Sequence, residues 1–205
     1  MIICASNNLI PYNVQIANKI FYIGNIIYPL GIFVLLAESN STNLTDGLDG
    51  LLSGCSVLIF TGMALTIVIT NPSNNFNLAP LCIVMAGACM GFLFLNKYPA
   101  KIFMGDSGSL ALGASLGGIA LLSNNLWSLF IMGGVLAAES ISVIIQVSIF
   151  KISRRLKGKG YKLFLMTPLH HHFELKGNKE TLIVGSFWLV TLLLVMINLI
   201  LLIKS

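Results

Sequence analysis

The chain has 205 residues, of which 56% are hydrophobic and only 9% are charged, and its formal net charge is +5. A mean hydropathy of +0.90 argues against a soluble globular domain, so we expect an integral membrane protein. The four cysteines have no spacing typical of a metal site, and we assign them neither a disulfide nor a chemical role.

Several apolar runs are long enough to cross the hydrocarbon core of a bilayer as helices. A core about 30 Å thick needs about 20 apolar residues in a helix. The sequence therefore predicts an all-α, polytopic membrane protein with a single membrane domain and about six transmembrane helices. The fourth run is short and glycine-rich, and a buried or re-entrant helix is its alternative. The predicted spans are residues 20–37, 51–70, 78–95, 109–123, 126–150 and 182–203.

The connections between the spans predict the orientation of the chain. All Lys and Arg residues except Lys19 and Lys204 fall in or next to the connections 38–50, 96–108 and 151–181, which the positive-inside rule makes cytoplasmic. The basic stretch from Arg154 to Lys162 could serve only to fix the orientation in the membrane, or it could attract anionic lipid headgroups and phosphates. With six spans both termini then lie outside, and the residues after Met1 do not resemble a signal peptide. We therefore expect that further spans precede Met1 or that the chain belongs to a longer one.

The first polar segment is Asn43-Leu44-Thr45-Asp46-Gly47-Leu48-Asp49-Gly50, which lies between two spans. Acids at the edge of a membrane are expensive unless they face water, a metal or a partner, which favours a functional site. If the segment is helical, Asp46 and Asp49 lie on one face. Carboxylates on separate loops suit Mg²⁺, which prefers one or two of them together with substrate phosphates.

Two further polar segments share this side of the membrane, residues 97–109 and 167–174. In the first, Gly105 and Gly108 enclose Asp106 just before a span, where phosphate could meet the backbone N–H groups of a helix start. The second contains His170, His171 and His172. Three adjacent histidines cannot easily converge on one tetrahedral zinc, so we favour phosphate contact by one or two of them.

The segments NLTDGLDGL, KIFMGDSGSLALG and TPLHHHFELKG, in this order, closely resemble the phospho-N-acetylmuramoyl-pentapeptide transferase family. The likeness extends from about Tyr28 to the end of the chain. The polyprenyl-phosphate N-acetylglucosamine-1-phosphate transferases share the first two segments loosely, and the histidine segment favours the former family. The resemblance implies a fold of about ten helices, of which this chain matches the carboxyl-terminal part. An Asp-Asp pair and a lysine that take part in the family's site lie in spans that this sequence lacks.

The resemblance also implies an activity at the cytoplasmic face of the bacterial inner membrane. Such an enzyme transfers phospho-MurNAc-pentapeptide from UDP-MurNAc-pentapeptide to undecaprenyl phosphate, which gives lipid I and UMP for peptidoglycan synthesis. Mg²⁺ is the implied cofactor. The expected partners are these two substrates, the lipid bilayer and, as a family expectation, a second copy of the chain, but no nucleic acid.

Carried over position by position, the resemblance assigns roles to individual residues. Asp106 corresponds to the principal magnesium ligand and, with Asp46, Asp49 and His170, to the catalytic group. The acceptor phosphate is already anionic near neutral pH, so the two turn aspartates could serve as base, as orienting groups or as metal support. The implied nucleotide- and substrate-binding residues are Asn43, Phe103, His171, His172 and Gln146, the last on one helix face with Glu139.

Two hypotheses from other classes remain beside the enzyme. A transporter would place polar groups in broken spans near the midplane, whereas these polar segments gather at the membrane edge. A non-catalytic scaffold or inactive fragment is the other, because the upstream acids are missing. Release of UMP would separate an enzyme from a transporter.

Overall fold

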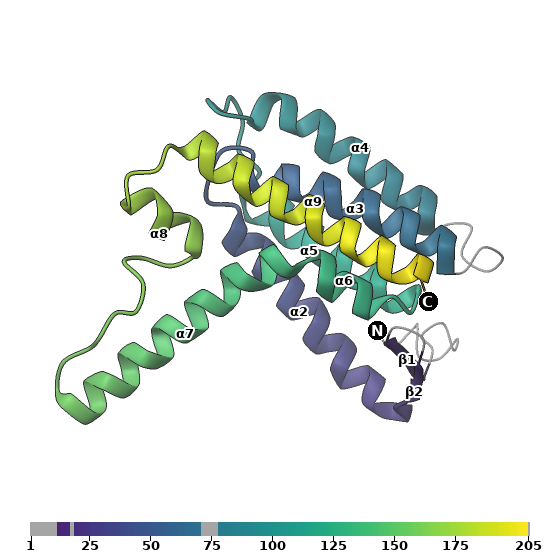
Figure 1. Cartoon of the computed structure of the whole chain (residues 1–205), viewed down its shortest axis with the longest axis horizontal. Helices are drawn as coiled ribbons and strands as arrows, with labels where there is room; N and C mark the ends of the chain where they lie inside the picture. Colours follow the sequence, from purple (N-terminus) through teal and green to yellow (C-terminus); the bar gives the residue numbers. More distant parts are fainter. Residues whose placement is uncertain (1–11, 17–18, 71–77, 205) are drawn as a thin grey trace.

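Figure 1 shows the chain as a computed structural model, which describes residues 12–16, 19–70 and 78–204. Within these residues eight α-helices form a bundle beside two short strands, so the chain is an all-α polytopic membrane protein, as the sequence predicts. The antiparallel strands are β1 (Asn13–Ile16) and β2 (Lys19–Tyr22), and the short 3-10 helix η1 (Gly24–Ile26) follows them. The helices are α2 (Ile27–Thr45), α3 (Leu51–Thr70), α4 (Leu78–Asn96), α5 (Gly105–Leu122), α6 (Leu126–Met132), α7 (Gly134–Lys157), α8 (Leu169–Leu175) and α9 (Glu180–Lys204).

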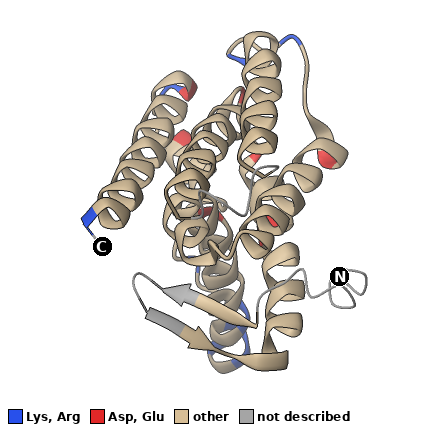
Figure 2. Cartoon of the chain, turned by 90° about the vertical axis from the view of Figure 1, so that its right-hand side faces the viewer, with Lys and Arg blue, Asp and Glu red and all other residues tan. Residues whose placement is uncertain are grey.

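Four of the described helices, α3, α4, α7 and α9, are long and apolar enough to cross a bilayer. Helix α3 lies at the centre and packs against α4 and α9. In its most apolar stretch 72% of the residues are buried, against 17% in α4 and α9, which therefore present most of their apolar side chains outward, as a lipid contact requires. Figure 2 shows that the bodies of the helices carry few charges.

The core is continuous between α3 and the helices around it. Phe60 and Met63 of α3 are fully buried together with Leu116 of α5, Met132 of α6 and Leu136 of α7. Helix α2 packs on the opposite side of this core, against α5 and α7. The helix pair α2 and α5 therefore joins the bundle as one unit, and it carries two of the three polar segments.

The largest differences between the helix boundaries and the predicted spans are at two places. The sequence predicts the first helix over 20–37, but residues 19–22 form β2 and α2 continues to Thr45, so much of the expected loop 38–50 is helical. The run 126–150 is predicted to be one span, but Gly133 separates α6 from α7, and α7 then continues to Lys157. The expected loop 151–181 accordingly shrinks and contains the short helix α8.

The three polar segments come together at one end of the bundle. In Figure 1 the turn 46–50, the connection 97–104 and α8 lie at the same end, opposite the carboxyl terminus. Helix α7 extends away from the bundle there, and residues 158–168, which we call the strap, return along it to α8. This end of the molecule is where the candidate site is built.

Candidate functional site

The first link in the site joins α2 to the start of α5. The Asn43 side-chain amide donates to Oδ1 of Asp106 at 3.0 Å and to the buried Ser109 hydroxyl, also at 3.0 Å. Asp106 lies in the first turn of α5, where a negative charge is stabilised by the helix dipole. The amide therefore holds the Asp106 carboxylate in place while leaving oxygen lone pairs free for another ligand.

A cavity of about 230 Å³ lies beside this link. Asp46 and Asp106 line it from different elements, and Phe103, whose side chain is 78% exposed, forms part of its wall. Burial, and secondarily the charge of Asp106, raise the pKa of the Asp46 carboxyl above its ordinary value. The cavity thus brings together the carboxylates of Asp46, Asp49 and Asp106, and the charge of Asp106 disfavours ionisation of Asp46.

Asp46 and Asp49 do not share a helix face, because α2 ends at Thr45 and a turn follows. Oδ2 of Asp49 accepts a hydrogen bond from the Ala100 backbone N–H at 2.8 Å, and the Asp49 backbone N–H donates to Glu180 at 2.8 Å. Asp49 therefore ties the turn to the 97–104 connection and to α9. A chemical role for Asp49 stays a prediction.

Asn96 holds the same connection from the end of α4. Its Oδ1 accepts hydrogen bonds from the Gly50 N–H at 3.2 Å and the Ser53 hydroxyl at 2.8 Å, and its Nδ2 donates to the Ile102 carbonyl at 3.0 Å. The side chain is buried, so losing these bonds would leave polar groups without partners. Asn96 and Glu180 are not among the predicted site residues. Their signal in the sequence is a single polar residue next to an apolar run, which is too common to be specific.

His170 lies against the aspartate turn. It is fully buried. A Cβ at position 47 would collide with the Nε2 atom of its ring, so Gly47 makes room for the ring. On the other side, Nδ1 lies 3.2 Å from Oε1 of Glu139 in α7. The histidine segment is therefore packed directly on the turn that carries Asp46.

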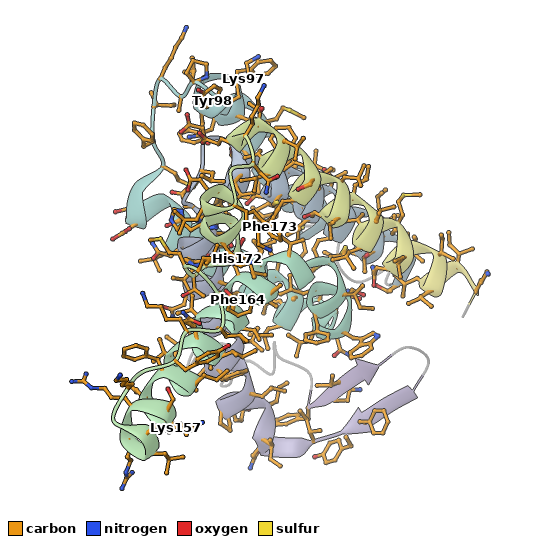
Figure 3. The ribbon with its side chains drawn as sticks, turned by 60° about the vertical axis from the view of Figure 1, so that its left-hand side comes forward. Lys97, Tyr98, Lys157, Phe164, His172 and Phe173 are labelled. Atoms are coloured by element: carbon orange, nitrogen blue, oxygen red, sulfur yellow. The ribbon has the colours of Figure 1, made fainter. Side chains whose placement is uncertain are left out.

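The other two histidines point elsewhere. Nδ1 of His171 lies 2.9 Å from Glu174 Oε2, and Nδ1 of His172 accepts the Leu165 backbone N–H at 3.1 Å. The His172 ring also meets the rings of Phe164 and Phe173 edge-on, each at a centroid distance of 5.6 Å. Figure 3 shows these three side chains in succession along the strap and α8.

Gln146 anchors the strap on α7. Its Oε1 accepts the backbone N–H groups of Leu163 and Phe164 at 2.9 and 3.0 Å, and its Nε2 donates to the Phe164 carbonyl at 3.0 Å. Gln146 does not line the cavity of Asp46 and Asp106. In this arrangement it acts on the strap, and direct contact with substrate stays a prediction.

The donor set fits Mg²⁺ held jointly with a substrate. Within the described residues no group of three or more His, Cys, Asp or Glu side chains could hold a metal by itself. Three carboxylates line one cavity, those of Asp46, Asp49 and Asp106, and Asp49 already accepts a hydrogen bond from the Ala100 N–H. Magnesium is commonly bound by one or two carboxylates plus substrate phosphates, which matches Asp106 with Asp46 beside it.

A family model described as glycosyl transferase family 4 matches residues 1–124, more than half of the chain. The chain belongs to glycosyl transferase family 4. The matched residues of this family member include Asn43, Asp46, Asp49 and Asp106, and α8 with its histidines lies beyond them.

Relatives of this family 4 chain carry the name of the family that the three segments resemble. A phospho-N-acetylmuramoyl-pentapeptide-transferase of Prochlorococcus marinus (strain NATL2A) is 85% identical over the whole chain, which covers 55% of that relative. Proteins of the same name from Synechococcus sp. (strain CC9605) and Synechococcus sp. (strain CC9311) are 58% and 57% identical, over 87% and 84% of the chain and 51% and 47% of the relatives. The chain spans about half the length of these curated relatives.

Proposed function

We propose that the chain contributes the site of a phospho-N-acetylmuramoyl-pentapeptide transferase, which moves phospho-MurNAc-pentapeptide from its UDP carrier to undecaprenyl phosphate and releases UMP. The observation that carries this proposal is the convergence of the three polar segments. Asn43 binds Asp106, Asp46 shares a cavity with Asp106, and His170 packs on the turn between Asp46 and Asp49.

Phosphoryl transfer depends mainly on positioning and on neutralising negative charge. Mg²⁺, when bound, would neutralise charge on the diphosphate, and Asp106 would hold it. Asn43 keeps the Asp106 carboxylate oriented through its hydrogen bond to Oδ1. Asp46, whose carboxyl takes a proton more readily than an ordinary aspartate because its pKa is raised, is placed to orient the acceptor phosphate or support the metal.

The remaining roles follow from exposure and position. The exposed Phe103 ring at the wall of the cavity is free to stack on the uracil of the donor. His170 packs on Gly47 of the turn, and the His171 ring lies beside the His170 ring. We place the histidine contact with the diphosphate on this side of the turn. We place this end of the bundle at the cytoplasmic face of the bacterial inner membrane, because the basic segments gather there. A homodimer is part of the same proposal.

The proposal is tested by UMP release. The purified chain is assayed in detergent with UDP-MurNAc-pentapeptide, undecaprenyl phosphate and Mg²⁺, alone and co-expressed with the part of the P. marinus (strain NATL2A) relative that it does not cover. We expect Mg²⁺-dependent release of UMP in at least the co-expressed pair, lost in Asp106→Asn and kept in Glu174→Gln, which alters an exposed carboxylate. Release that survives Asp106→Asn, or no release from the folded pair, would contradict the proposal.

A further inference from the structure

Glu139 is a buried acid near the start of α7. Its side chain is fully buried, in a helix otherwise apolar enough to cross a bilayer. Removing a carboxylate from water is unfavourable unless a partner compensates it. His170 contacts this acid: Oε1 of Glu139 accepts the His170 backbone N–H at 3.3 Å and lies 3.2 Å from its Nδ1.

Both members of this pair retain unused polar atoms. Oε2 of Glu139 and the two ring nitrogens of His170 are buried and have no aligned hydrogen-bond partner among the described residues. The Nδ1 to Oε1 contact is therefore electrostatic, at ion-pair distance but without hydrogen-bond alignment. A pair kept only for stability would normally satisfy these atoms, and buried polar groups without partners call for an explanation.

The ring of His170 is held from two sides. Glu139 contacts the Nδ1 edge, whereas Gly47, in the turn between Asp46 and Asp49, lies against the Nε2 edge. A side chain at position 47 would occupy the place of Nε2. The ring therefore has little room to rotate, and its Nε2 edge faces the turn.

We propose that Glu139 is the positioning residue of His170. It keeps Nδ1 protonated and turned toward α7, so that the Nε2 edge packs on Gly47 and holds the Asp46–Asp49 turn, which lines the cavity where the donor diphosphate would lie. This inference rests on the proposed function, because holding the turn matters for turnover only if the phosphates bind in the cavity that the turn lines. Glu139 acts through His170 and does not touch the substrate.

The first test reads the ring directly and needs no turnover. The chain is labelled with ¹⁵N-histidine, and the His170 signals are assigned by their loss in His170→Asn. We expect a protonated Nδ1 in the unchanged chain and in Glu139→Gln, whose amide oxygen can still face Nδ1, and the other tautomer or a mixture in Glu139→Met. An unprotonated Nδ1 in the unchanged chain, or the same tautomer in Glu139→Met, would overturn the proposal.

The second test uses the co-expressed enzyme. Per folded molecule, Glu139→Met should lower kcat by about 10- to 100-fold with little change in KM, since groups that orient a catalytic ligand have effects of this size. Glu139→Gln should recover most of the activity. If Glu139 only stabilised the fold, both variants would give less folded protein with an unchanged kcat. That result would contradict the positioning role.

If Glu139→Met does not fold, Gly47→Ala can be used instead, because it perturbs the His170 ring at its Nε2 edge. The new Cβ should displace His170 and change its ¹⁵N spectrum, and the loss of melting temperature should disappear in a His170→Ala background. Gly118→Ala, where a Cβ meets nothing within 4 Å, is the matched control. An unchanged spectrum in Gly47→Ala would contradict the proposal. Failure of UMP release with the expected spectra would instead remove the proposed function alone.

Discussion

The ionised form of the Asp46 side chain is less favourable in the folded chain than in the unfolded one. Burial is the larger cause and the charge of Asp106 the smaller, and both raise its pKa. A group with a raised pKa contributes stability below its unfolded-state pKa and loses that contribution as the pH rises through the folded-state value. At neutral pH, without a bound cation, Asp46 therefore lowers the free energy of unfolding.

Asp46→Asn should accordingly stabilise the chain while lowering UMP release. In buffer with a chelator, we expect a higher melting temperature than the unchanged chain at neutral pH, and a difference that shrinks as the pH falls toward about 4, where an ordinary aspartate takes up its proton. Melting in detergent micelles over this pH range measures it, with Glu174→Gln as the exposed control. A lower melting temperature of Asp46→Asn at neutral pH would show that the carboxylate is a stabilising group.

At the scale of the elements, the site depends on how closely α2 and α5 cross. A Cβ on Gly113 of α5 would collide with the Glu38 carbonyl oxygen and the Thr42 hydroxyl of α2. Small residues at such crossings let helix backbones approach. Asn43 and Asp106 come from these same two helices, so their 3.0 Å bond requires the close crossing.

Gly113→Ala should therefore separate the two helices and weaken that bond. We expect a loss of about 1–3 kcal/mol in the free energy of unfolding, the usual result of overpacking, together with reduced UMP release. Gly118→Ala on the same helix meets nothing within 4 Å and should be neutral or slightly stabilising, because alanine favours helix. Denaturation of both variants in the same detergent is the measurement, and equal stability of the two would refute the role of the crossing.

The apolar runs predict which segments form long helices but not where all of them end. The polar residues after Glu38 suggest a loop, yet within α2 the Thr42 and Thr45 hydroxyls donate to backbone carbonyls four residues earlier, so these buried hydroxyls have partners inside the helix. The break at Gly133 leaves no signal in hydrophobicity. The sequence identifies the three polar segments, whereas the contacts of Glu139 with His170 and of Gln146 with the strap depend on how α7, the strap and α8 pack, which periodicity does not encode.

At the scale of the whole molecule, three segments far apart in the sequence form one site because α3 organises the bundle. The turn 46–50 leads into α3, the 97–104 connection follows α4, and α9 carries the Glu180 carboxylate that holds the turn. Since α4 and α9 both pack on α3, each brings its own part of the site to the same end.

In the proposed function, Asp106 holds a divalent cation together with the donor diphosphate, and Asp46 lies beside it in the same cavity. The most direct measurement is electron paramagnetic resonance of Mn²⁺, as a substitute for Mg²⁺, with the chain and UDP, compared among the unchanged chain, Asp106→Asn and Glu174→Gln. We expect UDP to increase Mn²⁺ binding to the unchanged chain and to Glu174→Gln, and Asp106→Asn to lose this increase. Equal Mn²⁺ binding by Asp106→Asn, with or without UDP, would contradict the account.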